Sequence, residues 1–150
     1  MSLFKKVHGN IFTGMEDLKG IGGRLSKLAR FGLGGKVGTG AQGISWIHEN
    51  DMNRLFFKTL IDPKMEGAYL ATAPNPVSNA IFMRELRKAL RMPLGLPTAE
   101  WMVRIGAPLM MKIDSELALY GRYCVSRRLE KDGVQFEYPD IAPAMKQLFL

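Results

Sequence analysis

The chain has 150 residues, 47% of them hydrophobic and 23% charged, which is the balance of a globular protein with a core and excludes extended disorder. A single cysteine, Cys124, excludes an internal disulfide and a multi-cysteine metal site, and it favours a reducing, cytoplasmic compartment. The net charge of +7 suits an anionic partner, but the basic residues are scattered and have no aromatic residues interleaved with them, so we do not expect nucleic acid as a partner. No apolar run approaches the roughly 18 residues of a membrane span, so we do not expect a membrane as a partner either.

Two short strands and a glycine-rich stretch are predicted in the first third of the chain. Val7–Phe12 has the pattern of a strand, and Gly20–Gly43 contains one helical segment at about Arg24–Phe31. β-Branched and aromatic residues over Ile44–Ile47 favour a second strand.

A helix is predicted directly after that strand. Asn50 or Asp51 caps it, and Asp62-Pro63 ends it after about Ile61. Its apolar positions share one face, made of Met52, Leu55, Phe56 and Leu60.

A proline-rich loop follows the next strand. The apolar run Ala68–Thr72 predicts this strand, and the two prolines of Ala73–Val77 fix the backbone of the loop. Ser78 or Asn79 then caps a helix to about Arg91. The side chains of Asn75 and Asn79 either contact a ligand or satisfy the turn, and the residues alone leave both readings open.

The chain after this helix is predicted to be mainly helical. An irregular connector covers Met92–Pro97, and helices begin near Thr98 and near Asp114 or Ser115, the second running toward Tyr120.

The C-terminal end contains two further helices and a strand in this prediction. A short helix covers Ser126–Lys131 and stops at Asp132-Gly133. Strict alternation over Val134–Tyr138 predicts a half-buried strand. Asp140 caps the last helix, whose apolar stripe is Ile141, Met145, Leu148 and Phe149. The fold class is therefore α/β, with few short strands and several helices, too few strands for a doubly wound sheet of its own.

No catalytic constellation is complete in the sequence. Gly38–Gly43 matches G-x-G-x-x-G, but it precedes a strand instead of following one, so we interpret it as a turn and not as a dinucleotide loop. His48 with Glu49 and Asp51 has no second histidine at the spacing that metals require, so a hydrogen-bonded core histidine is the better interpretation. No tyrosine is followed by lysine four residues later.

Two motifs resemble those of a known family. One runs from Gly34 to Gln42 and continues through Ser45-Trp46-Ile47-His48 to Asp51, and the other is Ala73-Pro74-Asn75-Pro76-Val77-Ser78-Asn79. Both are similar to motifs of the atypical extended short-chain dehydrogenase/reductases known as NAD-dependent epimerase family proteins. The resemblance covers about residues 7–148. It implies that residues 1–91 are a remnant of the nucleotide-binding fold plus a substrate-side lobe, and that residues 92–150 are a C-terminal helical cap domain of unknown function.

The resemblance also implies a set of substrate-side residues. These are Gln42, Trp46, His48 and Asn75, with Asn79 less directly, and Arg122, which can hold an anionic group. Judged from the residues alone, Trp46 fits core packing as well, and Arg122 fits an ion pair or a carbonyl contact at a helix end. Related sugar-nucleotide epimerases often have arginine near the position of Gln42. A neutral amide offers no charged fork for a diphosphate, which weighs against a nucleotide-sugar substrate.

Full-length members of the family use NAD(P), bound by an N-terminal Rossmann half with a glycine-rich loop and a Tyr-x-x-x-Lys pair, and neither motif occurs here. We therefore expect the substrate-side and C-terminal part of an NAD(P)-dependent epimerase/reductase-like protein, with no cofactor or activity as this chain alone and with the missing half as its partner. The alternative is a non-catalytic interaction module that forms a homo-oligomer through apolar surface.

Overall fold

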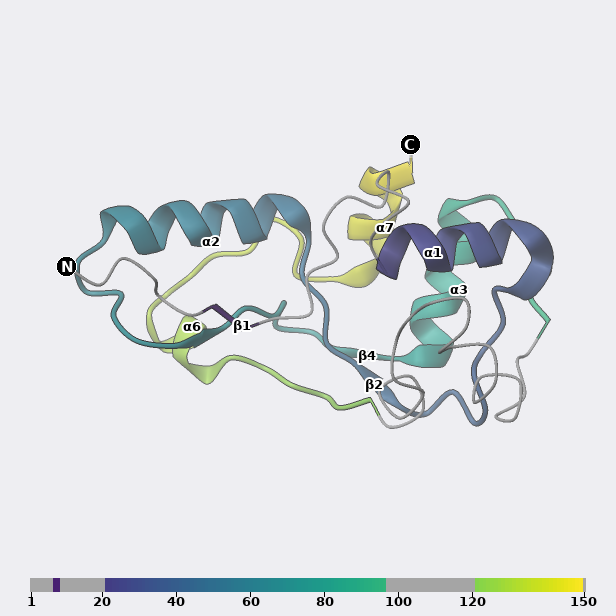
Figure 1. The fold of residues 1–150 in the computed structure, drawn as a ribbon, viewed down its shortest axis with the longest axis horizontal. Helices are drawn as coiled ribbons and strands as arrows, with labels where there is room; N and C mark the ends of the chain where they lie inside the picture. Colours follow the sequence, from purple (N-terminus) through teal and green to yellow (C-terminus); the bar gives the residue numbers. More distant parts are fainter. Residues whose placement is uncertain (1–6, 9–20, 97–120, 150) are drawn as a thin grey trace.

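The computed structural model describes residues 7–8, 21–96 and 121–149 (Figure 1). The fold is mixed α/β, as predicted, with few strands and several helices. Its elements, in chain order, are β1 (Val7–His8), α1 (Ile21–Leu28), a π-helical turn η1 (Ala29–Leu33), β2 (Gly43–Ile44), α2 (Glu49–Ile61), β3 (Tyr69–Leu70), β4 (Val77–Ser78), α3 (Asn79–Ala89), α6 (Arg127–Lys131) and α7 (Ile141–Phe149). The helices predicted near Thr98 and from Asp114 or Ser115, and the end of the first predicted strand, lie outside the described residues.

The described strands form two small sheets. β1 pairs parallel with β3, with Val7 opposite Tyr69, and β2 pairs antiparallel with β4, with Gly43 opposite Ser78. β2 and β3 are each shorter than the strands that the sequence predicts there, over Ile44–Ile47 and Ala68–Thr72. Pro74 and Pro76 explain why pairing breaks off between β3 and β4, because neither has a backbone N–H to donate.

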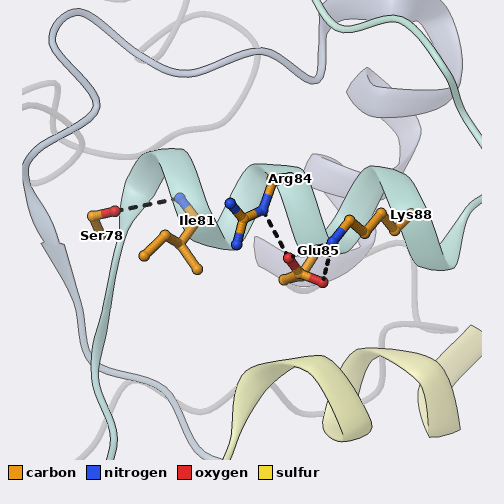
Figure 2. A network of polar contacts seen from close by, with 5 residues as sticks. All are labelled: Ser78, Ile81, Arg84, Glu85 and Lys88. Carbon is orange, nitrogen blue, oxygen red and sulfur yellow. Dashed lines mark hydrogen bonds and ion pairs between the residues drawn. The ribbon is translucent and has the colours of Figure 1, made fainter.

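One hydrophobic cluster joins α3 to α7. α3 contributes Phe82, Met83 and Leu86, and α7 contributes Ile141, Ala144 and Met145, with Trp46 in the same cluster. Ser78, one of the two predicted caps, is the cap of α3, because its Oγ accepts a hydrogen bond from the N–H of Ile81 at 3.3 Å (Figure 2). The stripe predicted for the last helix is therefore confirmed for Ile141 and Met145, which are buried against α3.

A second cluster joins α2 and β3 to α6. Met52 and Leu55 pack with Tyr69 and with Leu129 of α6. Arg128 lies over the ring of Tyr69, 4.2 Å from its centroid, and the Tyr69 hydroxyl donates to Asp132 Oδ2 at 2.7 Å. Residues before and after position 91 thus share both clusters, and the division of the chain into domains at that position stays a prediction.

The start and the faces of α2 differ from the prediction. The cap is His48, not Asn50 or Asp51, because its imidazole Nδ1 accepts from the N–H of Asn50 at 3.1 Å. The buried face contains Asp51, Met52, Leu55 and Thr59, while Phe56 and Leu60 are 44% and 70% exposed. The spacing of apolar residues predicts a helix, but it does not predict which of those residues the rest of the fold buries.

The strand predicted over Val134–Tyr138 is wrong. No strand is assigned there; the N–H groups of Glu137 and Tyr138 donate to the Asp51 carboxylate at 2.7 and 2.9 Å. Val134 and Phe136 pack against the second cluster, which accounts for the alternating pattern without a sheet partner.

Candidate functional site

The glycine-rich loop closes on the start of α3. Gly38 and Gly40 have φ of 53° and 74°, which glycine adopts without the steric cost of a side chain. The N–H of Val37 donates to Asn79 Oδ1 at 2.9 Å, and the N–H of Asn79 donates to the carbonyl of Gln42 at 2.9 Å. Gln42 Nε2 donates to the carbonyl of Val37 at 3.1 Å. The side chains of Asn79 and Gln42 therefore serve as hydrogen-bond partners for the backbone of this turn.

Two glycines allow segment 121–124 to lie directly against β2. A Cβ on Gly43 would come within 2.5 Å of the backbone nitrogen of Tyr123, and a Cβ on Gly121 within 2.1 Å of the Gly43 carbonyl. Any larger residue at either position must displace backbone. The sequence prediction missed this contact, because no local pattern links positions so far apart.

Hydrogen bonds hold the backbone of the same segment in place. Ser45 Oγ donates to the carbonyl of Arg122 at 2.9 Å and accepts from the N–H of Cys124 at 2.8 Å. The Tyr123 hydroxyl donates to the carbonyl of Ala41 at 2.9 Å. Arg122 is exposed, and the structure records no partner for its guanidinium among the described residues. A guanidinium on a fixed backbone, with no partner within the described ranges, is an arrangement that can hold an anion.

Trp46 and Asn75 are brought together. The Trp46 indole is buried and donates from Nε1 to the carbonyl of Asn75 at 3.0 Å. Asn75 is itself exposed, and its Nδ2 donates to Asp140 Oδ1 at 2.7 Å. The buried Trp46 indole therefore holds the backbone of the loop at Asn75, and the Asn75 side chain is exposed beside the start of α7.

His48 is enclosed. Its ring is 1% exposed and lies 4.0 Å from the Tyr138 ring, centroid to centroid. Because Nδ1 accepts from the N–H of Asn50, the proton of the neutral ring is on Nε2, which then donates to Gln147 Oε1 at 2.8 Å. Both nitrogens have partners, as expected for a core histidine. The substrate-side roles of Gln42, Trp46, His48, Asn75 and Arg122 stay predictions.

A charge cluster lies on α3 (Figure 2). Glu85 accepts from Arg84 Nε at 2.8 Å and from Lys88 Nζ at 3.0 Å. Burial alone would raise the pKa of the Glu85 carboxyl, but the hydrogen bonds from Lys88 and Arg84 outweigh it and hold the pKa below its ordinary value. An ionised, paired carboxylate of this kind is a structural charge and not a proton donor.

A groove of about 330 Å³ lies beside α2, away from these residues. None of the predicted site residues lines it; its walls are Asp51, Arg54, Leu55, Phe57, Lys58, Gly133, Val134, Gln135 and Phe136. Within the described ranges, no cluster of three or more His, Cys, Asp or Glu residues is placed to bind a metal ion. None of the described helices combines the length and apolar composition needed to cross a membrane.

Curated proteins similar to the chain are epimerase family proteins. It is 28% identical to the chloroplastic SDR39U1 homolog of Arabidopsis thaliana, over 85% of this chain and 36% of the relative. It is 30% identical to SDR39U1 of Mus musculus, over 85% and 43%, and 29% identical to YfhF of Bacillus subtilis, over 79% and 38%. No family model matches the chain.

Two solved structures resemble the fold. The human epimerase family protein SDR39U1 (isoform 2), solved with NADPH, superposes with a TM-score of 0.82 at 25% identity, over 95% of this chain and 46% of that one. A nucleoside-diphosphate sugar epimerase from Corynebacterium glutamicum superposes with a TM-score of 0.68 at 26% identity, over 97% and 26%. The homologues of the chain are thus epimerase family proteins of the SDR39U1 kind, and the chain spans less than half of the length of each of these relatives.

Proposed function

We propose that the chain supplies the substrate-side and C-terminal part of an NAD(P)-dependent epimerase- or reductase-like protein. The observation that carries this proposal is the similarity, over 95% of the chain, to the human SDR39U1 structure solved with NADPH. That similarity extends over only 46% of the human chain, so a protein of that kind also contains a part that these 150 residues do not match.

The cofactor is expected to depend on that remaining part. Gly38–Gly43 precedes β2, and its amides are used within the turn: the N–H of Gly40 donates to the Val37 carbonyl at 2.9 Å, and that of Ala41 to Thr39 Oγ1 at 3.3 Å. A dinucleotide loop instead presents such amides to a pyrophosphate at the start of a helix. This loop does not fit that role.

The substrate is expected to meet the exposed groups along β2 and the loop after β3. Arg122 supplies a positive charge for an anionic group, and Asn75 supplies an exposed amide. Gln42, Trp46 and His48 shape the wall behind them through their hydrogen bonds. Because Gln42 brings no charge, we expect a substrate with a single anionic group more than a diphosphate.

A chimera tests the proposal. In it, this chain replaces the matching region of mouse SDR39U1, and calorimetric titration measures its binding of NADPH and NADH. We expect stoichiometric NADPH binding by the chimera and none by the chain alone. Tight stoichiometric binding to the isolated chain, or a folded chimera that binds neither cofactor, would contradict the proposal.

A homo-oligomeric interaction module is the second candidate. Exposed apolar side chains on α2, among them Phe57 at 63% and Leu60 at 70%, favour association of some kind. Sedimentation velocity over a range of concentrations tests it, and a monomer at the highest concentration argues against this candidate.

A further inference from the structure

Helix α2 is apolar on two sides. Met52 and Leu55 face the second cluster, where both are 2% exposed. The other apolar side, which we call the outer face of α2, consists of Phe56, Phe57, Leu60 and Ile61, with exposed fractions of 44%, 63%, 70% and 64%. Surface helices normally carry polar residues opposite the buried stripe, so this apolar face has the composition of an interface without its partner.

The sheet packed with α2 is also incomplete. β1 and β3 form a parallel pair of only two strands, and the described residues supply no third strand to this sheet. Parallel sheets are normally larger and covered by helices on both faces. Figure 1 shows α2, β1 and α6 together at one end of the molecule, away from α3 and α7. Both incomplete features therefore occur at the same end.

We propose that the outer face of α2 is the docking surface for the part of an epimerase-family protein that this chain does not match. The inference rests on the proposed function and adds the location of the contact. The relatives have length for such a part, because the chain spans only 36–43% of the Arabidopsis and mouse proteins. A part that pairs with the free edge of the β1–β3 sheet and also extends over α2 buries the outer face.

A second copy of the chain fits this end less well. Copies related by a two-fold axis place the same edge strand against itself, and the two strands then run antiparallel, which does not continue the parallel order of β1 and β3. The net charge of +7 on each copy also opposes self-association.

Co-expression tests the location. The probe is the part of mouse SDR39U1 outside the match, tagged and expressed together with this chain, and the yield of co-purified chain is measured. We expect a one-to-one complex with the unaltered chain, and a yield lower by about tenfold or more for Phe57→Asp and for Leu60→Asp, because buried apolar anchors dominate interfaces. The matched control is Leu94→Asp, which changes a leucine that is 76% exposed and belongs to the segment after α3. Circular dichroism verifies that all variants are folded.

The outcomes separate the two proposals. Undiminished yield of both α2 variants, equal loss for Leu94→Asp, or no complex with the unaltered chain overturns the docking surface, while NADPH binding by the chimera is judged separately. A complex that depends on α2 while the chimera binds no cofactor supports the docking surface and contradicts the proposed function. Sedimentation of the chain alone completes the test: self-association abolished by Leu60→Asp would identify a second copy as the occupant and overturn the proposal.

Discussion

Replacing Asp51 by alanine is expected to destabilise the fold severely. The Asp51 carboxylate is buried at the start of α2, and it accepts the N–H groups of Glu137 at 2.7 Å and of Tyr138 at 2.9 Å. It thereby joins the first turn of a helix to a segment more than eighty positions away. Alanine removes both acceptors and leaves two partly buried backbone donors without a partner.

The size of the loss follows from these two bonds. A hydrogen bond to a charged group contributes roughly 1.5–3 kcal/mol, so the pair contributes about 3–6 kcal/mol. The Arg54 guanidinium, at 3.9 Å from Asp51 Oδ1, adds little because its side chain is 56% exposed. For Asp51→Asn, which keeps one acceptor oxygen, we expect roughly half of the loss found for alanine.

Urea denaturation followed by circular dichroism gives the free energy of unfolding of each variant. The matched control is Asp62→Asn, because Asp62 Oδ1 accepts a single exposed N–H, that of Lys64, at 3.0 Å. This control should change the free energy of unfolding by no more than about 0.5 kcal/mol. If Asp51→Ala cost less than about 1 kcal/mol, water would be satisfying both donors and the reasoning would be refuted.

Three further substitutions test other parts of the structure. Gly43→Ala should lower the free energy of unfolding by roughly 1–3 kcal/mol, since its Cβ would meet the Tyr123 backbone; an unchanged urea midpoint would show that segment 121–124 adjusts. Glu85→Gln should cost about 1 kcal/mol at neutral pH, a modest value because Arg84 and Lys88 are largely exposed. The lowered folded pKa of Glu85 means that this contribution is present above the unfolded pKa and disappears as pH falls through the folded pKa, so a pH-independent difference in urea midpoint would contradict it. For Tyr69, burial and then the hydrogen bond to Asp132 raise the pKa above 10.0, so the folded state holds the proton more tightly and stability falls as pH rises past the unfolded pKa. Ultraviolet titration of tyrosinate absorbance and alkaline denaturation should show that Tyr69→Phe removes this fall, and an equal fall in the variant would refute the assignment.

Features set by neighbours in sequence could be predicted. Ser78, one of the two caps predicted for α3, caps that helix, and the short helix predicted over Ser126–Lys131 is α6. Its first predicted residue, Ser126, is instead the cap and accepts the N–H of Leu129 at 3.4 Å. Gly133 stops α6 with φ of 65°. Each depends on a side chain or a conformation within about four residues, the range over which capping and turn preferences act.

Features set by distant segments could not be predicted. Asp51 looked like a cap, yet its carboxylate binds the backbone of Glu137 and Tyr138, and no local pattern encodes that partner. The alternation that suggested a strand at Val134–Tyr138 reflects the partial burial of Val134 and Phe136 against the second cluster and of Tyr138 against the first. Among the candidate site residues, His48 is a hydrogen-bonded core histidine, as interpreted from the sequence, and Trp46 is buried, in agreement with its core-packing alternative, while their substrate-side roles stay predictions. The contact of the Arg122 carbonyl with Ser45 could not be predicted, because it depends on the fold.

The candidate substrate wall and the proposed docking surface belong to separate parts of the fold. The wall is fixed within the chain, because Ser45 holds the backbone of Arg122 and Trp46 holds that of Asn75. The outer face of α2 makes no contribution to those bonds. Docking on the outer face therefore leaves the hydrogen bonds of the wall unchanged. It follows that Leu60→Asp should weaken the complex without disturbing Arg122 or Asn75, whereas Gly43→Ala should disturb Arg122 and leave the docking face intact.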